Sequence, residues 1–282
     1  MAMGIQWNKP LVLGTSLVGL LFFTYVSYSL LTRRSEPTHQ LKMFKTWKRR
    51  ETRSLPEDIE AKSEKVDVKV KERTFTYQSQ EVKLHYLEAS PASEPKLHIL
   101  LLHGAAFSSK NWEEIKTLHL IAAMGHLAIA IDLPGASKSK TKGIKISDRA
   151  DFLDTVIKQL DIKKPIIVSP SMSGGYSLPF IMGSNSETCT DRALGFIPVA
   201  PVGTDNYKPV QYNRCQLPTM IVYGDQDSGL GLTSLGNLRN LPNSEIFPIK
   251  GGSHPCYLDE PEYWNKLVYN FLLEIESDQN SK

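Results

Sequence analysis

The chain has 282 residues, of which 41% are hydrophobic, and this length and composition fit one α/β domain together with an appended segment. The formal net charge is only +3, and the basic residues are accompanied by no zinc-finger spacing, RNA-binding signature or glycine-rich phosphate loop. These features argue against nucleic acid as a partner, and we expect no metal or other cofactor.

An apolar segment lies close to the N-terminus, because no charged residue occurs in residues 10–32. As a helix rising about 1.5 Å per residue, such a segment matches the hydrocarbon core of a bilayer. The alternative is a cleaved secretory signal, but the segment exceeds the usual apolar region of a signal peptide and lacks an A-x-A-like cleavage site. We therefore predict a transmembrane signal-anchor helix at residues 10–32, after a short N-terminal tail at residues 1–9.

A basic segment follows the apolar one. Residues 33–73 hold 13 Lys or Arg and 8 Asp or Glu, and residues 33–64 show no sustained apolar period. We predict that residues 33–64 form a basic juxtamembrane linker whose cations contact anionic lipid headgroups. The positive-inside rule then places the body of the protein in the cytosol.

Two weaker features agree with a cytosolic location. The three cysteines form an odd set in a chain long enough to need no disulfide, and no N-x-Ser/Thr glycosylation acceptor occurs. Both features favour a reducing compartment.

The folded domain is predicted at residues 65–276, before a C-terminal tail at residues 277–282. Alternating patterns in VDVKVKERTFTY and VKLHYLEA predict an antiparallel hairpin at its start. Further strands are predicted at 97–102, 127–132, 165–169, 195–200, 218–224 and 245–250, and helices near 111–123, 147–161, 231–240 and 260–275. Nearly continuous apolar strands that alternate with amphipathic helices predict an α/β class, with a mostly parallel central sheet and helices on both faces.

Three serines stand at alternate positions where one predicted strand ends, in the stretch SPSMSGG. Functional groups collect beyond the carboxyl ends of parallel strands, and a nucleophile elbow needs small residues two before and two after the nucleophile. Ser171 and Ser173 both meet that requirement. A strand leading to Ser173 would run through Pro170, which cannot donate a ladder hydrogen bond, whereas Ser171 places Pro170 in the turn and starts the helix at Met172. We predict Ser171 as the nucleophile; the alternative is a polar turn in which a serine caps the helix.

A nucleophilic serine needs a base and an acid that orients it. The strand PTMIVYG is followed by Asp225 and Asp227, and the strand EIFPIK is followed by a loop that contains His254. The order serine, acid, histidine is that of the α/β-hydrolases. Asp227 is preferred because it lies further along its loop and can better reach an imidazole, which leaves Asp225 to hold the turn through local backbone.

The loop HGAAF follows another predicted strand, where this architecture places a second oxyanion donor. The backbone amides of Ala105 and Met172 are therefore predicted to form the oxyanion hole. Asp132, in DLPG, is a weaker alternative acid because it follows the wrong strand for the usual order. Cys256 is predicted to be a small buried group and not a nucleophile.

The motifs SPSMSGGYSLPF, LLHGAAFSS, DLPG, VYGDQD and GGSHPCYLDEPE together resemble the α/β-hydrolase domain-containing type 14 family over residues 66–275. The N-terminal anchor is similar to that of the membrane-bound A type within this family. The resemblance implies an α/β-hydrolase fold, a triad of Ser171, Asp227 and His254, and a type II orientation. That orientation opposes the cytosolic one given by the charge bias, so the side of the membrane is left open.

We expect a membrane-anchored serine hydrolase that cleaves acyl esters, or alternatively acyl amides, through an acyl-enzyme. Only residues 200–216 separate two core strands, which leaves room for a minimal lid and favours short or medium acyl groups. The alternative from another class is a catalytically idle scaffold that binds a protein partner at the membrane. The expected partners are a small acyl substrate and, through the helix and linker, membrane lipid; the sequence identifies no protein partner.

Overall fold

The computed structural model describes residues 52–136, 138–139, 145, 148–183 and 188–281. Within these residues one sheet has the strand order β1-β2-β4-β3-β5-β6-β7-β8. Its strands are β1 (Val68–Tyr77), β2 (Gln80–Ala89), β3 (His98–Leu101), β4 (Leu127–Ile131), β5 (Ile166–Pro170), β6 (Gly195–Val199), β7 (Thr219–Gly224) and β8 (Ser244–Ile249). The pairs β1–β2 and β2–β4 are antiparallel and the other pairs are parallel. The predicted mostly parallel sheet is confirmed.

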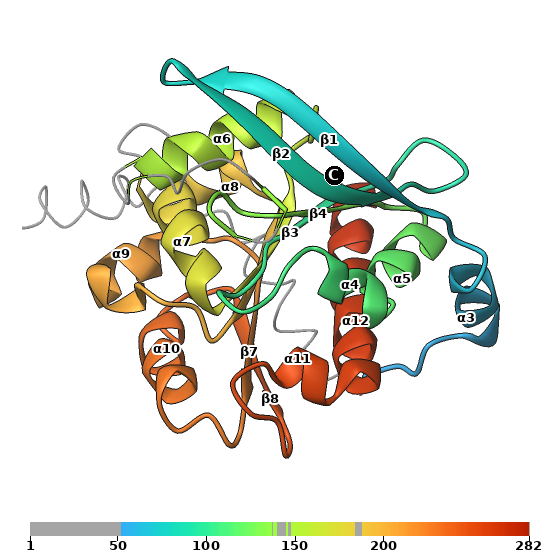
Figure 1. Ribbon diagram of the computed structural model, residues 1–282. Helices are drawn as coiled ribbons and strands as arrows, with labels where there is room; N and C mark the ends of the chain where they lie inside the picture. Colours follow the sequence, from blue (N-terminus) through green and yellow to red (C-terminus); the bar gives the residue numbers. More distant parts are fainter. Residues whose placement is uncertain (1–51, 137, 140–144, 146–147, 184–187, 282) are drawn as a thin grey trace, which may run out of the picture. The chain divides into compact units, whose positions relative to one another are not determined.

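Helices cover both faces of this sheet, as predicted. They are α3 (Glu57–Ser63), α4 (Lys110–Glu114), α5 (Thr117–Ala123), α6 (Arg149–Gln159), α7 (Gly174–Met182), α8 (Cys189–Arg192), α9 (Pro209–Arg214), α10 (Leu230–Leu238), α11 (Cys256–Asp259) and α12 (Pro261–Asn280), with 3-10 turns η2 (Ser171–Ser173) and η3 (Thr204–Asn206). Figure 1 shows α5 and α12 on one side of the sheet and α6 and α7 on the other. Alternate residues of β3 accordingly enter two separate core clusters, Ile99 in one and Leu100 in the other.

The predicted hairpin is confirmed and has a shorter turn than expected. Gln78 and Ser79 alone connect its strands, with φ of 45° and 63°. Two consecutive residues at positive φ match the right-handed twist of the flanking strands.

The helix predicted near residues 111–123 is divided into α4 and α5. Lys116 between them has a left-handed backbone with φ of 63°, which ends the first helix. Asn265 of α12 donates its side-chain amide to the carbonyl of Ile115 at 2.7 Å. A tertiary contact thus satisfies a carbonyl that the break leaves without a helical partner.

The last part of the predicted linker packs on the folded domain. The backbone of Arg53 exchanges two hydrogen bonds with the side chain of Asn270 on α12, and Leu55 and Ile59 pack against the core. Only two apolar side chains make this contact, which is too short a pattern to recognise in the sequence. The predicted tail and membrane helix, residues 1–32, lie outside the described residues, and none of the described helices is both long and apolar enough to cross a bilayer.

The cysteines differ from the expectation that the chain does without disulfides. Cys189 and Cys215 form a disulfide between α8 and the end of α9, and Cys256 is free and buried. The two bonded residues are 26 positions apart, in segments that the sequence pattern left unassigned. Their pairing therefore depends on tertiary structure and could not be predicted.

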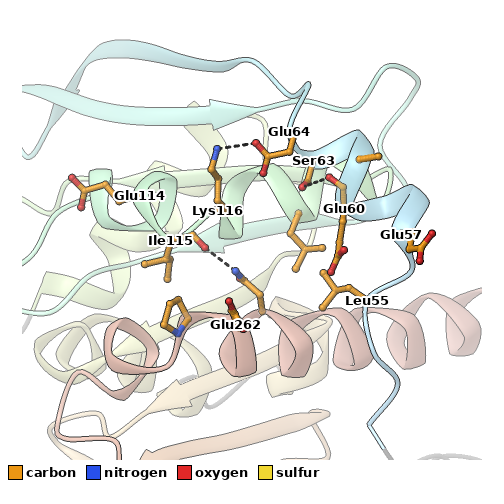
Figure 2. A pocket seen from close by; sticks show the side chains of 13 residues that line it. Leu55, Glu57, Glu60, Ser63, Glu64, Glu114, Ile115, Lys116 and Glu262 are labelled. Carbon is orange, nitrogen blue, oxygen red and sulfur yellow. Dashed lines mark hydrogen bonds and ion pairs between the residues drawn. The ribbon is translucent and has the colours of Figure 1, made fainter.

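A hollow of about 790 Å³ lies between α3, the α4–α5 junction and the start of α12 (Figure 2). Its lining is rich in glutamate: Glu57, Glu60, Glu64, Glu114 and Glu262. Lys116, which also lines it, pairs with Glu64 at 3.5 Å. None of the predicted catalytic residues contributes to this hollow.

Candidate active site

Ser171 lies in a sharp turn between β5 and α7. Its φ is +49°, in the left-handed region that non-glycine residues rarely occupy and that marks strained functional turns. The amide of Val202 donates to the carbonyl of Ser171 at 2.9 Å. A Cβ on Gly174 would lie 2.4 Å from the carbonyl oxygen of Val202, so only glycine allows the start of α7 to lie this close to the loop after β6.

Two details of the predicted turn are wrong. Pro170 is the last residue of β5 and not part of the turn, because a missing amide at the end of a strand costs little. The α-helix begins at Gly174 after the 3-10 turn Ser171–Ser173, and not at Met172, since the sharp turn first closes with tighter 3-10 bonding.

The other two serines of the motif are interior hydrogen-bonding groups. Ser169 and Ser173 are fully buried, and their hydroxyls lie 3.0 Å apart. Ser169 also bonds to Ser177 at 2.6 Å, and Ser173 donates to the carbonyl of Pro170 at 2.7 Å. Serines replace the usual glycines of such a turn here because each hydroxyl has a buried partner.

The structure brings the predicted base and acid to Ser171. His254 Nε2 lies 2.8 Å from Ser171 Oγ, and His254 Nδ1 lies 2.6 Å from Asp227 Oδ2. The three side chains follow the ends of β5, β7 and β8. In the parallel part of the sheet these strands stand in the order β5-β6-β7-β8. With the aspartate ionised, Nδ1–H donates to Asp227, which leaves Nε2 free to accept the proton of Ser171.

The carboxylate of Asp227 is largely buried, with 8% of the side chain exposed. Burial raises the pKa of Asp227, but the hydrogen bond with His254 and the influence of the nearby backbone amides of Gly231 and Gly229 outweigh it and hold the pKa below its usual value. Asp227 is therefore ionised at neutral pH, as an acid that orients the imidazole requires.

The loops that carry the acid and the histidine are tied together. Asp225, the rival acid, accepts a hydrogen bond from the backbone amide of Gly251 at 2.8 Å. The backbone amide of Gln226 donates to the carbonyl of Gly252 at 3.0 Å. A Cβ on Gly224 would lie 2.2 Å from the carbonyl of Ser253, so glycine is needed where the loops meet. Asp225 thus bonds to the backbone of the neighbouring loop, and not to local backbone as the sequence predicted.

The HGAAF loop also lies against Ser171. A Cβ on Gly104 would be 3.5 Å from Ser171 Cβ. The carbonyl of Gly104 accepts the ring Nδ1–H of His103 at 2.8 Å and the amide of Phe107 at 3.1 Å. Because C=O and N–H point in opposite directions across a trans peptide, holding this carbonyl also fixes the direction of the Ala105 amide.

Asp132 and Cys256, the other residues considered from the sequence, have structural surroundings. The Asp132 carboxylate accepts the amides of Ser109 at 2.8 Å and Lys138 at 3.1 Å and pairs with His85 at 3.2 Å, so it anchors the loop after β4. Burial raises the pKa of the Cys256 thiol to about 12, which keeps it protonated. Among the described residues, no three His, Cys, Asp or Glu side chains are grouped so as to hold a metal ion.

Relatives of known name place the chain in a family, although no protein-family model matches it. Putative protein-lysine deacylase ABHD14B of Homo sapiens is 42% identical over 212 residues, which are 73% of this chain and 98% of that protein. Protein ABHD14A of Danio rerio is 40% identical over 201 residues, which are 68% of this chain and 73% of that protein. The chain belongs to the ABHD14 family.

Membership in the ABHD14 family confirms the expectation of a hydrolase. The structure of a predicted CIB-like hydrolase from Thermoplasma acidophilum matches with a TM-score of 0.64 at 21% identity, covering 73% of this chain and 99% of that one. A bromoperoxidase from Bacillus anthracis matches with a TM-score of 0.59 at 15% identity, covering 72% and 99%. These likenesses confirm the α/β-hydrolase fold.

Three supports of the site were not predicted from the sequence: the Ser169–Ser173–Ser177 network, the start of α10 close to Asp227, and a brace beside His254. In this brace Asp259 accepts both the amide and the hydroxyl of Ser253, at 2.7 and 2.6 Å. The alternating serines signal the first support. The other two depend on how separate loops meet and leave no signal in the sequence.

Proposed function

We propose that this ABHD14 protein is a membrane-anchored serine hydrolase that removes acyl groups with Ser171, His254 and Asp227 as its catalytic triad. The observation that carries the proposal is the continuous hydrogen-bonded chain from Ser171 through His254 to Asp227, with distances of 2.8 and 2.6 Å. The positive φ of Ser171 supports it further, because a strained turn exposes the hydroxyl at the top of the sheet.

The reaction follows from this geometry. His254 takes the proton of Ser171 as the oxygen attacks the acyl carbonyl, and Asp227 stabilises the imidazolium. The amides of Ala105 and Met172 receive the negative charge on the carbonyl oxygen. His254 then gives its proton to the leaving alcohol or amine, and the acyl-enzyme remains. A water molecule, deprotonated by His254, releases the carboxylic acid and restores Ser171.

The proposed substrates are short or medium acyl esters and acyl amides. The segment between β6 and β7 contains only η3 and the six-residue helix α9, which supports a small lid and a short acyl group. The human relative named putative protein-lysine deacylase ABHD14B supports including acyl-lysine amides.

The membrane part of the proposal is an A-type ABHD14 protein with an anchor at residues 10–32 and a basic linker that contacts lipid headgroups. The charge bias after the anchor favours a cytosolic domain. The Cys189–Cys215 disulfide favours the opposite side, because disulfides persist in oxidising compartments. On the strength of this disulfide we propose a type II orientation.

Turnover of two acyl donors tests the proposed activity. Full-length protein in detergent is assayed with p-nitrophenyl acetate and with a peptide that carries Nε-acetyl-lysine. We expect hydrolysis of at least one donor and a loss of about 10³-fold or more in Ser171→Ala. Equal rates in wild type and Ser171→Ala would contradict the proposed nucleophile. A folded wild type inactive on both donors and on further acyl chain lengths would favour the idle scaffold.

A further inference from the structure

Helix α10 begins beside the carboxylate of Asp227. It starts at Leu230 with Gly229 as its N-cap, and the backbone amides of Gly231 and Gly229 favour the ionised form of that carboxylate. Partial positive charge gathers at the first turn of a helix, so this helix start both stabilises the ionised acid and determines where it lies.

Gly231 leaves the space that the carboxylate occupies. A Cβ at position 231 would lie 2.9 Å from Cβ and Cγ of Asp227 and 3.0 Å from Oδ2, well inside the roughly 3.5–4.0 Å of ordinary carbon contacts. Oδ2 is the oxygen that bonds to His254. The backbone of Asp227 has little freedom to move away, because its amide donates to the carbonyl of Gly224 at 3.0 Å.

Backbone conformation does not require glycine at this position. Gly231 is helical and buried, and it is not among the glycines with positive φ. Inside a helix, glycine is less favourable than alanine. The missing side chain is therefore explained by the space that Asp227 fills.

We propose that Gly231 is a positioning residue that sets the catalytic acid against His254. This inference rests on the proposed triad. Any side chain at position 231 would move the Asp227 carboxylate away from Nδ1 of His254 and leave the imidazole poorly oriented, while Ser171 and the oxyanion donors stay in place.

The same helix supplies a matched control. Gly236 is exposed, and a Cβ there would meet nothing within 4 Å. We expect Gly231→Ala to lower the inactivation rate constant with a fluorophosphonate by about 10²-fold, with unchanged probe affinity. The downfield ¹H NMR resonance of the His254 Nδ1–H···Asp227 bond is expected to be lost. Gly236→Ala keeps the wild-type rate and resonance.

A double-mutant cycle separates positioning from general damage. In the Asp227→Ala background, which removes the carboxylate, Gly231→Ala is expected to slow labelling no further; an equal slowing in both backgrounds would overturn the inference. So would a wild-type rate and resonance in Gly231→Ala. Wild-type labelling in Asp227→Asn would instead contradict the triad itself, and this inference with it. Circular dichroism confirms that each variant is folded.

Discussion

At the scale of single residues, neighbouring serines in one short motif have different tasks because their surroundings differ. Ser171 is held at positive φ with its hydroxyl on His254, whereas Ser169 and Ser173 are fully buried and bonded to each other. That Ser171, and not Ser173, lies beside His254 could be predicted, since Pro170 limits how far the strand extends. The hydrogen-bond partners of the buried serines could not, because one of them, Ser177, lies on the following helix.

Ser173→Ala therefore acts on stability and not on chemistry. Its hydroxyl donates to the carbonyl of Pro170, and losing that donor costs about 1–3 kcal/mol. We expect a lower midpoint of urea unfolding together with fluorophosphonate labelling like that of the wild type. Labelling abolished in folded Ser173→Ala would assign the nucleophile to the other register.

His126 gives the protein a dependence of stability on pH. Its side chain is fully buried, and burial lowers its pKa to about 4, with Glu276 opposing the shift only in part. In the unfolded chain the histidine pKa is near 6.5. Between pH 4 and pH 6.5 His126 is therefore protonated in the unfolded chain and neutral in the folded protein. The stabilisation is complete above about pH 6.5 and is lost as the pH falls toward 4.

Between pH 7 and pH 5 this histidine is expected to remove about 2 kcal/mol from the free energy of unfolding. His126→Leu places an apolar side chain at the buried position and should reduce the pH dependence by that amount. Urea unfolding of both proteins at the two pH values measures it. Identical pH dependence in the two proteins would show that His126 is not the responsible group.

At the scale of elements, the predicted strands are found within a few residues of their expected positions because continuous aliphatic runs determine them. Shorter elements were missed where a tertiary contact makes them. The break between α4 and α5 relies on Asn265 of α12, and α3 packs on the core through Ile59, with Leu55 just before it. Neither contact has a local pattern, and the same is true of the disulfide between α8 and the end of α9.

The disulfide closes a loop with a sequence separation of 26 residues, which corresponds to about 3.5 kcal/mol of stabilisation in the chain-entropy description. The double variant Cys189→Ala, Cys215→Ala should lose about that much free energy of unfolding. Dithiothreitol should lower the free energy of unfolding of the wild type by a similar amount and leave that of the variant unchanged. Equal stability of wild type and variant under non-reducing conditions would contradict the assignment.

At the scale of the whole molecule, parallel β5, β7 and β8 end at the same edge of the sheet and so bring together residues that are distant in sequence. This is why the order of serine, acid and histidine predicted the geometry, whereas the bonds that tie the loops to one another could not be foreseen. The alternation of strands and helices predicts a mostly parallel sheet, but it does not give the observed strand order, in which β4 lies between β2 and β3. The side of the membrane does not follow from either, since charge bias and disulfide oppose each other.

Protease protection on sealed microsomes decides the orientation. A type II protein with its disulfide in an oxidising lumen should keep the folded domain intact until detergent opens the vesicles. Digestion of the domain in sealed vesicles would place it in the cytosol and contradict the proposed type II orientation.

The most direct test of the central claim is to locate the fluorophosphonate adduct on the full-length protein by tandem mass spectrometry. We predict one adduct on Ser171, absent in His254→Ala and formed about 10⁴-fold more slowly in Asp227→Asn. An adduct on Ser169 or Ser173, or no adduct on the folded wild-type protein, would contradict it.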